Sequence, residues 1–429
     1  MMHITDDRPP FARVILESGA STSRAVHYPD NAIHEKQFEE LLEILKVKDV
    51  PEDQLIEVLR SMPVDFIKNG SEKIFENYNY SLRWPFQPVI DGKGGIIALP
   101  PIDSWRQGLF HKVPIMAGFT TNEGTMFVPQ NLSSSDEFID FFHTLLPGLS
   151  KGDLSKLDQL YPDPTKRPLG EAKEPSGDTS SEQPLNEKHS SKKREETTET
   201  PEGPEKAIPI VIDDREVAAP LIPFSNDQKP KLKSLSVNIP YLETRPGFGL
   251  QYTRLSAAYG HFAYTCPVRQ TVQFLSGGDH ATSRRSRLLK RESPVEYEAP
   301  PIYVYQFAAN TSVDYGARHT SHAGFTTYNP EMYYKSPTTR DIAGTMHAYW
   351  TSFILSGRPN GVRKTNWGDR GEWPSYTDKE APGKKMVFGR GNDEIAGGQG
   401  RGIVTRVVYD DWPAKECEFW WERTHLFES

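Results

Sequence analysis

One glutamate stands where open α/β sheets place catalytic side chains. In "MAGFTTNEGTMF", residues 116–127, an apolar run turns polar within a few positions, and Glu123 lies between Asn122 and Gly124. A short buried strand that ends in a small-residue turn puts such an acid at the carboxyl end of the strand, where catalytic groups of these sheets gather. An ordinary loop glutamate in water fits the same residues, so this stretch alone leaves both interpretations open.

Composition excludes several classes of partner. The 429 residues include 50 Lys and Arg against 58 Asp and Glu, a formal net charge of -8 that provides no footprint for nucleic acid or an anionic membrane. We therefore expect no nucleic-acid partner. No apolar run approaches the roughly 20 residues that a membrane-spanning helix needs. No cluster of Cys and His predicts a metal site, and we expect no cofactor.

Cysteines and glycosylation motifs bear on the cellular compartment. Cys266 and Cys417 are too few and too far apart for a zinc site, and either one disulfide or two buried thiols fits them. The opening "MMHITDDRPP" lacks the charged and then apolar layout of a signal peptide, so we expect no address in the chain as written. The pattern N-x-[ST], which is glycosylated only in the secretory pathway, occurs at Asn69, Asn79, Asn131 and Asn310.

Apolar runs and helical periodicity predict the elements that position Glu123. Residues 14–16 are expected to form a fully buried strand, and similar runs cover 112–119 and 301–309. After the first strand a helix is expected, and a second helix is expected to begin at Pro51. Strands buried on both faces with helices between them favour an α/β fold with a mostly parallel central sheet flanked by helices. The helix expected after the first strand has its apolar face at Ile33, Phe38, Leu41, Leu42 and Leu45.

Two later segments also have clear helical patterns. The stretch "DIAGTMHAYWTSFILSG" ends at Gly357, and its aromatic stripe is typical of a core rather than of a cofactor site. The closing "CEFWWERTHLF" predicts a terminal helix that docks Phe419, Trp420 and Trp421 on the body of the protein. The stripe of the first segment comprises Ile342, Met346, Tyr349, Trp350, Phe353 and Ile354.

Two segments interrupt this pattern. Residues 165–247 are rich in Glu, Lys, Ser, Thr and Pro, and they have too few apolar side chains to offset the entropy of ordering, so we expect a disordered insertion. Residues 277–293 contain a basic run that is more typical of a solvated surface loop than of a site for an acidic partner. This leaves residues 1–164 and 248–429 as one expected domain.

Outside these insertions, nine blocks follow one another along the chain. They are "FARVILESGA", "RWPFQPVIDGKGG", "VPIMAGFTTNEGT", "YTCPVRQTVQF", "YVYQFA", "YGARHTSHAGF", "MHAYWTSFILSGRPNG", "WPSYT" and "CEFWW". In this order they resemble the C-terminal part of the type B carboxylesterase and cholinesterase family. The resemblance implies the α/β-hydrolase fold and hydrolysis of a small-molecule carboxylic ester by a serine, a histidine and a glutamate.

Residue by residue, the resemblance implies two catalytic groups. Glu123 in "NEGT" matches the acid that orients the histidine, and His319 in "GARHTSH" matches the general base. A serine hydroxyl needs a base to take its proton, and the imidazole needs a carboxylate on its other nitrogen. The family usually has glycine after this histidine, whereas Thr320 follows here and His322 is a second candidate base. We prefer His319 because "YGARH" aligns best after the "YVYQFA" block.

The resemblance further implies a disulfide. Family members carry the two ends of a long-range disulfide in the blocks that contain Cys266 and Cys417 here. Such a bridge requires an oxidising compartment, so we expect a protein of the secretory pathway.

The nucleophile is the largest departure from the family pattern. In the family, the G-x-S-x-G nucleophile elbow and an H-G-G-type oxyanion segment precede the block "FARVILESG", which lies near the start of this chain. We therefore expect an N-terminally truncated α/β-hydrolase with neither a G-x-S-x-G nucleophile elbow nor an H-G-G-type oxyanion segment. Ser18 closes a strand, Ser352 lies on a helix, and Ser321 follows no strained strand-to-helix turn, so none of the three is expected to act as the nucleophile.

Two functions from different classes follow. The first is an ester hydrolase of which this chain carries only the acid and the base, and which is inactive without the missing segment. The second is a non-catalytic esterase-like protein that binds a ligand or an adhesion partner. Retention of Glu123 and His319 favours the first, while the identity of the ester and the oligomeric state stay open.

Overall fold

The computed structural model of the chain describes residues 9–23, 27–166, 244–277, 299–363, 367, 370–378 and 383–427. They belong to one compact unit, formed by Met1–Ala172 together with Ser234–Ser429. Apart from its ends, the expected insertion at 165–247 lies outside the described residues, as does the basic segment after Gly277. The division of the chain into these parts stays a prediction.

A mostly parallel sheet runs through this unit. Its strand order is β1-β2-β3-β4-β5, with the first four strands parallel and β5 antiparallel to β4. The strands expected at 14–16, 112–119 and 301–309 correspond to β1, β2 and β3. The bounds are β1 Val14–Glu17, β2 Ile115–Thr120, β3 Ile302–Phe307, β4 Lys384–Phe388 and β5 Thr405–Tyr409.

Helices lie in the sequence between β1 and β4 and again after β5. The α-helices are α1 Ala32–Ile44, α2 Glu52–Ser61, α3 Val64–Asn79, α4 Pro101–Arg106, α5 Ser135–Leu145, α6 Lys151–Leu160, α7 Tyr252–Gly260, α8 Cys266–Leu275, α10 Ala323–Thr326, α11 Pro330–Tyr333, α12 Pro337–Ser356, α13 Ala414–Trp421 and α14 Thr424–Phe427. Short 3₁₀ turns are η1 Glu123–Met126 and η2 Pro164–Lys166, and the π-helix η4 His261–Thr265 joins α7 to α8.

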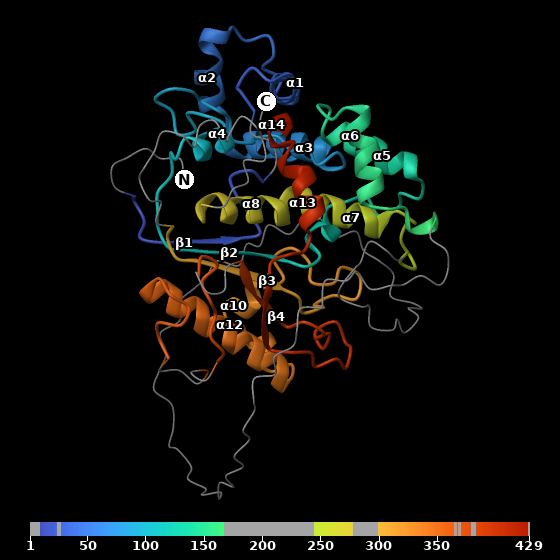
Figure 1. Cartoon of the computed structure of the whole chain (residues 1–429). Coiled ribbons are helices and arrows are strands. Elements are labelled where there is room, and N and C mark those ends of the chain that lie inside the picture. The colour runs from blue at the N-terminus through green and yellow to red at the C-terminus, as the bar shows by residue number, and fades with distance from the viewer. Residues whose placement is uncertain are drawn as a thin grey trace, which may run out of the picture. The chain divides into compact units, whose positions relative to one another are not determined.

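Helices cover both faces of the sheet. Figure 1 shows α7, α8 and α13 on one side of the strands, with α10 and α12 on the other. The pleat explains this arrangement, because successive side chains of β2 point to opposite faces. Met116 packs into the core that includes α12, whereas Ile115, Ala117 and Phe119 pack into the core that includes α8.

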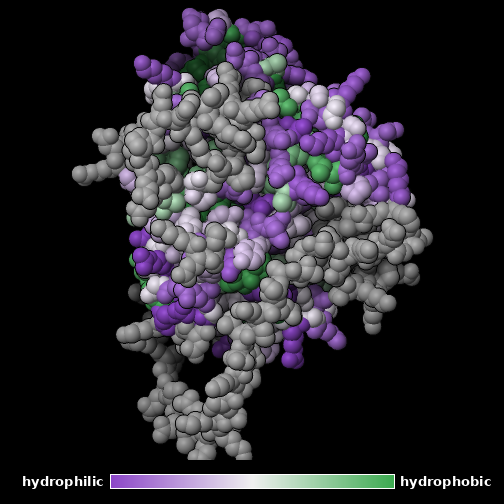
Figure 2. All heavy atoms as spheres, in the orientation of Figure 1, coloured by the Kyte–Doolittle hydropathy of each residue, from purple (hydrophilic) through white to green (hydrophobic). Residues whose placement is uncertain are grey.

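Some predictions of burial are wrong. Val14, Ile15 and Leu16 of β1 are only half-buried, because β1 pairs on one side with β2 and no described strand covers its other edge. Phe38 in α1 and Ile354 in α12 are 44% and 57% exposed, although both lie on predicted apolar faces. On the face drawn in Figure 2, the described surface is mostly hydrophilic, and hydrophobic residues show only in small separate groups.

Sequence patterns do not single out α3, β4 or β5. Strand β4 contains Lys385, whose buried ammonium group interrupts the apolar run expected of a central strand. Helix α3 buries only Gly70 and Ile74 and leaves much of its apolar surface exposed, so its pattern is weak.

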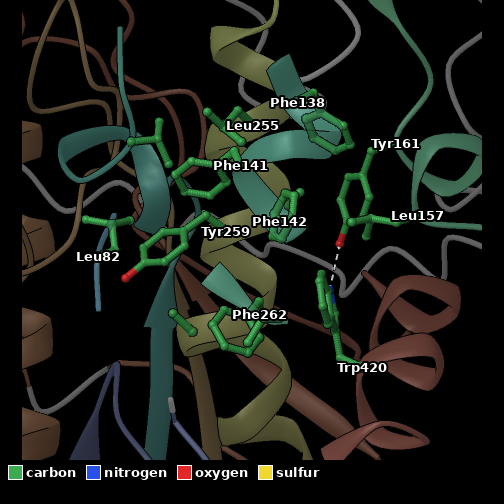
Figure 3. Packing of buried hydrophobic residues seen from close by; sticks show 14 of the residues in the cluster. Leu82, Phe138, Phe141, Phe142, Leu157, Tyr161, Leu255, Tyr259, Phe262 and Trp420 are labelled. Carbon is green, nitrogen blue, oxygen red and sulfur yellow. Dashed lines mark hydrogen bonds between the residues drawn. The ribbon is translucent and has the colours of Figure 1, made fainter. Parts of the chain in front are cut away.

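The C-terminal helices dock as predicted on an aromatic core. Phe419 and Trp420 of α13 are buried in a cluster that also contains residues of α5, α6 and α7, and Figure 3 shows Trp420 beside Phe142 and Tyr161. Trp420 Nε1 donates a hydrogen bond to the hydroxyl of Tyr161 (3.1 Å). Trp421 is half-buried at the edge of this cluster.

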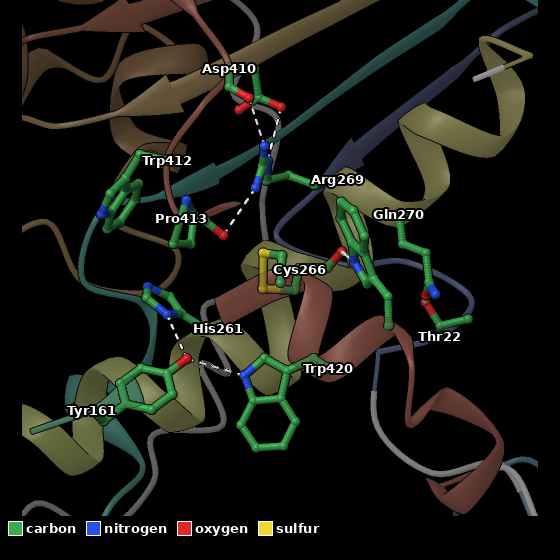
Figure 4. Close-up of a disulfide and its surroundings, with 12 residues drawn as sticks. Thr22, Tyr161, His261, Cys266, Arg269, Gln270, Asp410, Trp412, Pro413 and Trp420 are labelled. Atoms are coloured by element: carbon green, nitrogen blue, oxygen red, sulfur yellow. Dashed lines mark hydrogen bonds and ion pairs between the residues drawn. A yellow bond between two sulfur atoms is a disulfide. The ribbon is translucent and has the colours of Figure 1, made fainter. Parts of the chain in front are cut away.

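A disulfide holds α13 to α8, an ion cluster ties α8 to the segment just before α13, and we call this part of the molecule the anchor region (Figure 4). Cys266 and Cys417 form the disulfide that the resemblance implies, with their Cα atoms 5.0 Å apart. Nearby, Asp410 accepts hydrogen bonds from Arg269 Nε (2.9 Å) and Lys385 Nζ (3.1 Å). All three charged side chains are nearly inaccessible to solvent.

Candidate active site

Glu123 lies at the carboxyl end of β2. The chain leaves β2 at Thr120, turns through Thr121 and Asn122, and enters η1 at Glu123. The carboxylate is 1% exposed, and its Oε1 accepts a hydrogen bond from the Thr120 backbone N–H at 2.6 Å. The strand end therefore holds one carboxylate oxygen and leaves the other free to meet a partner.

That partner is His319. Nδ1 of its imidazole lies 2.7 Å from Glu123 Oε2, across 196 residues of sequence. Because a carboxylate only accepts hydrogen bonds, we assign the proton to Nδ1. The imidazole is 21% exposed, and among the described residues Nε2 has no hydrogen-bond partner. The geometry therefore fits a buried acid holding a histidine whose second nitrogen is available.

Backbone hydrogen bonds join the two loops. Asn122 N–H donates to the Ala317 carbonyl (2.9 Å), and Ala317 N–H donates to the Asn122 side-chain oxygen (3.0 Å). Thr121 N–H donates to the carbonyl of Phe307, the last residue of β3 (2.9 Å). These bonds continue the β2–β3 pairing beyond the strand ends, so the acid and the histidine are held at one edge of the sheet.

Close backbone packing supports the acid from behind. A Cβ atom placed on Gly124 would lie 2.0 Å from the Ser256 carbonyl oxygen and 2.8 Å from the Gly260 nitrogen. Both neighbours are backbone atoms of α7, which cannot swing aside. η1 can therefore pack this closely against α7 only with a glycine after Glu123, and this packing fixes the position of the Glu123 carboxylate.

Aromatic rings flank the histidine. The ring centroid of Tyr264 lies 4.4 Å from that of His319, and the ring of Phe127 packs edge-on at 5.3 Å. Neither ring is predicted as a site residue by the sequence. Phe127 ends the quoted stretch that contains Glu123, but Tyr264 lies in the π-helix η4, and apolar periodicity does not reveal where such a helix turns its side chains.

His322 lies elsewhere. Its side chain is 3% exposed, and its Nε2 is 3.5 Å from Oε1 of Glu17 rather than close to Glu123. The structure thus brings only one of the two candidate histidines to the acid. Between them, Thr320 has a φ of 66°, in the left-handed region that glycine adopts readily and a β-branched residue only rarely.

The pattern G-x-S-x-G does occur once, as "GLSKG" at residues 148–152, contrary to the expectation that the chain lacks it. Its serine, Ser150, is the exposed N-cap of α6, donating to Asp153 Oδ2 (2.6 Å) and accepting from Asp153 N–H (3.1 Å). The segment connects α5 to α6 and follows no strand, so it lacks the strand–turn–helix context of a nucleophile elbow.

The other serines also stay apart from the histidine. Ser352 Oγ donates to the Arg358 carbonyl (2.8 Å) and accepts from Val362 N–H (2.9 Å), which ties a loop to α12. Ser18 and Ser321 have buried hydroxyls without a hydrogen-bond partner among the described residues. Within the described ranges, no serine hydroxyl is hydrogen-bonded to His319.

Other predicted features of the chain are readily located. Asn69, Asn79 and Asn131 are exposed, whereas Asn310 is half-buried after β3. No group of three or more His, Cys, Asp or Glu in the described part of the chain is placed to hold a metal ion. None of the helices that the structure describes is long and apolar enough to cross a membrane.

Comparison with known proteins shows which proteins the chain is similar to. The model of the carboxylesterase family matches residues 1–203. Secreted lipase 4 of Gibberella zeae is 26% identical over 419 residues, covering 97% of this chain and 55% of the lipase. Together these matches support a member of the type B carboxylesterase and cholinesterase family. Acetylcholinesterase of Myxine glutinosa is 25% identical to the chain over 148 residues, covering 32% of this chain and 42% of the cholinesterase.

A solved relative shows the fold. The crystal structure of Aspergillus niger EstA matches this chain with a TM-score of 0.60 at 18% identity, covering 100% of this chain and 61% of EstA. The fold is therefore the predicted α/β-hydrolase fold. The chain spans between half and two thirds of the length of the lipase and of EstA.

Proposed function

We propose that this chain contributes the acid and the base of a Ser-His-Glu hydrolase that acts on carboxylic esters. The observation that carries the proposal is the 2.7 Å contact between Glu123 Oε2 and His319 Nδ1 at the carboxyl edge of the sheet. The match to the carboxylesterase family model supports it, as does the similarity to a lipase and to a cholinesterase. A purely adhesive relative has no need of this contact.

In the proposed mechanism, Glu123 holds His319 in the tautomer that carries its proton on Nδ1. Nε2 then takes the proton of a serine hydroxyl as the oxygen attacks the ester carbonyl, and it later gives that proton to the leaving alcohol. Glu123 stabilises the imidazolium that forms in each step. The rings of Tyr264 and Phe127 limit how far the imidazole can tilt during these transfers.

We further propose that the serine and the oxyanion hole come from a polypeptide segment outside these 429 residues. The context of Ser150 supports this, because a helix cap between α5 and α6 cannot present a nucleophile to His319. The edge of β1 offers a place for another parallel strand, since only β2 pairs with β1 in the described part of the chain.

Secretion is also part of the proposal. The disulfide between Cys266 and Cys417 is stable only in an oxidising compartment, and the Gibberella relative is named a secreted lipase. Of the four N-x-[ST] asparagines, the three exposed ones are the expected glycan sites. Endoglycosidase treatment of protein expressed in a eukaryotic secretory host should increase its mobility on a gel, and unchanged mobility would argue against glycosylation.

The test of function compares this chain with the same chain carrying its genomic upstream segment. We expect p-nitrophenyl ester hydrolysis, and stoichiometric labelling by an organophosphonate that reacts only with activated serines, in the longer protein alone. Labelling of the 429-residue chain would show that it holds its own nucleophile. A folded longer protein with neither activity nor labelling would favour the non-catalytic, ligand-binding or adhesive alternative.

A further inference from the structure

A second carboxylate–imidazole contact lies beneath the loop that carries His319. Glu17 ends β1, and His322 is the N-cap of α10, three residues after His319. Oε1 of Glu17 lies 3.5 Å from Nε2 of His322. The proposed mechanism uses neither side chain, yet a histidine that is 97% buried needs polar partners to offset its desolvation.

Strands β1 and β3 and helix α12 meet at this contact. The Tyr305 hydroxyl of β3 is 3.3 Å from the same His322 Nε2, and Trp350 Nε1 of α12 donates to Glu17 Oε1 at 2.9 Å. Burial raises the pKa of Tyr305 well above its usual value, with further contributions from the charges of Glu17 and Glu123, so the phenol stays neutral. The pKa of Glu17 is lowered, because hydrogen bonds from His322 and Trp350 outweigh burial, which is the largest single influence and acts in the opposite direction.

Only one side of the His322 ring is held by polar contacts. Its Nδ1 is buried and has no hydrogen-bond partner among the described residues, and the rings of Tyr305 and Phe307 lie at 5.8 and 6.3 Å. The orientation of the imidazole therefore depends on what Nε2 meets, and Glu17 is the charged group there.

The backbone between the two histidines transmits this restraint. Ser321 N–H donates to the Arg318 carbonyl (3.1 Å), and Ala323 N–H donates to the Thr320 carbonyl (2.9 Å), which leaves little slack in the turn. Thr320 occupies the left-handed region at φ 66°. A β-branched residue keeps such a conformation only where its surroundings over-determine it, and here restraints act on both sides.

We propose that Glu17 and His322 form a positioning pair that holds the turn at Thr320 and thereby keeps His319 on Glu123. His322 acts through the loop and touches no reacting atom. Its role in catalysis rests on the proposed function, whereas its effect on the Glu123–His319 hydrogen bond does not.

The primary test measures that hydrogen bond in the 429-residue chain by proton NMR. The Nδ1 proton of His319 should give a low-field resonance, assigned by its loss in Glu123→Gln. We expect Glu17→Gln and His322→Gln to shift this resonance upfield and speed its exchange with water, while the exposed His347→Gln, used as the matched control, leaves it unchanged. If His322→Gln does not fold, as judged by circular dichroism, the proposal is tested by Glu17→Gln alone. An unchanged resonance in folded Glu17→Gln, or no such resonance in the parent chain, would overturn the positioning pair.

Kinetics of the longer protein test the catalytic consequence. Glu17→Gln should lower kcat by about 10- to 100-fold with little change in KM, since a misplacement of the base near 1 Å costs up to that much. Adding Thr320→Gly to Glu17→Gln should restore part of kcat, because glycine adopts the required φ without restraint. Absence of any esterase activity would reject the proposed function and leave the NMR result standing, whereas a normal kcat in Glu17→Gln would reject the positioning role in catalysis.

Discussion

The candidate active site and the anchor region both bury a carboxylate, but they enclose it differently. Glu123 is held by one backbone N–H and one imidazole that reaches solvent. Asp410 meets two cations, Arg269 and Lys385, and none of the three reaches solvent appreciably. The partner of Glu123 can therefore exchange protons with its surroundings, whereas Asp410 and its partners are shielded from solvent.

Electrostatics separates the two regions further. The pKa of Asp410 is lowered although burial, the largest influence, would raise it, because the charges of Arg269 and Lys385 outweigh burial. Burial lowers the pKa of Lys385 despite its contact with Asp410. A carboxylate with fully compensating partners serves as an anchor, while one whose partner is partly exposed can take part in chemistry.

The largest expected effect is on activity. In the longer protein, Glu123→Gln should lower kcat by about 10⁴-fold, because the amide no longer enforces the tautomer that leaves Nε2 free. Glu137→Gln, at an exposed helix cap where glutamine also serves, is the control. Unchanged kcat for Glu123→Gln in a p-nitrophenyl ester assay would remove the distinction between the regions.

The disulfide should dominate the stability of the anchor region. It closes a loop of 151 residues, and replacing Cys266 and Cys417 by alanine should lower the free energy of unfolding by about 4–5 kcal/mol in the chain-entropy model. Urea denaturation monitored by tryptophan fluorescence measures this change. A denaturation midpoint equal to that of the parent would show that the anchor does not depend on the bridge.

Asp410→Asn should be nearly as damaging. It leaves Arg269 and Lys385 buried together without a counter-charge, which is expected to cost about 3–5 kcal/mol of unfolding free energy. Asp103→Asn, which breaks an exposed pair with Arg106, should cost no more than about 1 kcal/mol. Equal melting temperatures for the two variants would contradict the assignment of Asp410 as an anchor.

The anchor region should also respond to acid through His261. Burial, followed by the charge of Arg269, lowers the pKa of His261 to about 3, and its Nδ1 lies 2.8 Å from the Tyr161 hydroxyl. Below the unfolded pKa of about 6.5, the unfolded chain binds a proton that the folded chain refuses, so stability is full above that pH and falls as pH decreases.

His261→Gln should remove this contribution. When the pH is lowered from 6.5 to 5, the unfolding free energy should fall in both proteins, and the fall should be smaller in the variant by up to about 2 kcal/mol. Urea midpoints at both pH values give the comparison, with the exposed His347→Gln as control. Parallel losses in parent and variant would show that His261 does not titrate in this way.

The smallest expected effect separates strain from packing at the active site. Thr320→Gly should raise stability by about 0.5–1 kcal/mol, because relief of the left-handed strain exceeds the entropy cost of glycine. Thr320→Ala keeps the Cβ atom and should gain less. Thermal denaturation distinguishes the variants, and a destabilised Thr320→Gly would indicate that contacts of the threonine side chain outweigh the strain.

Patterns among neighbouring residues are enough to predict several parts of this fold. An apolar run followed by a small-residue turn was enough to predict β2 with Glu123 at its end, and periodicity was enough to predict α12 with its stop at Gly357. The ordered resemblance blocks predicted the α/β-hydrolase fold and the disulfide of Cys266 with Cys417. Short-range sequence patterns are sufficient to predict these strands and helices, because apolar periodicity and turn-forming residues act over a few neighbouring positions.

How those pieces meet depends on contacts across the fold. Glu123 and His319 are 196 residues apart, and although the resemblance favours His319 over His322, it is the β2–β3 pairing and its extension through Asn122 that bring His319 to the acid. The half-burial of β1 and the charged centre of the anchor region were equally hidden. The physical reason is that side-chain orientation, strand neighbours and charge compensation are set by contacts across space, which local sequence does not encode.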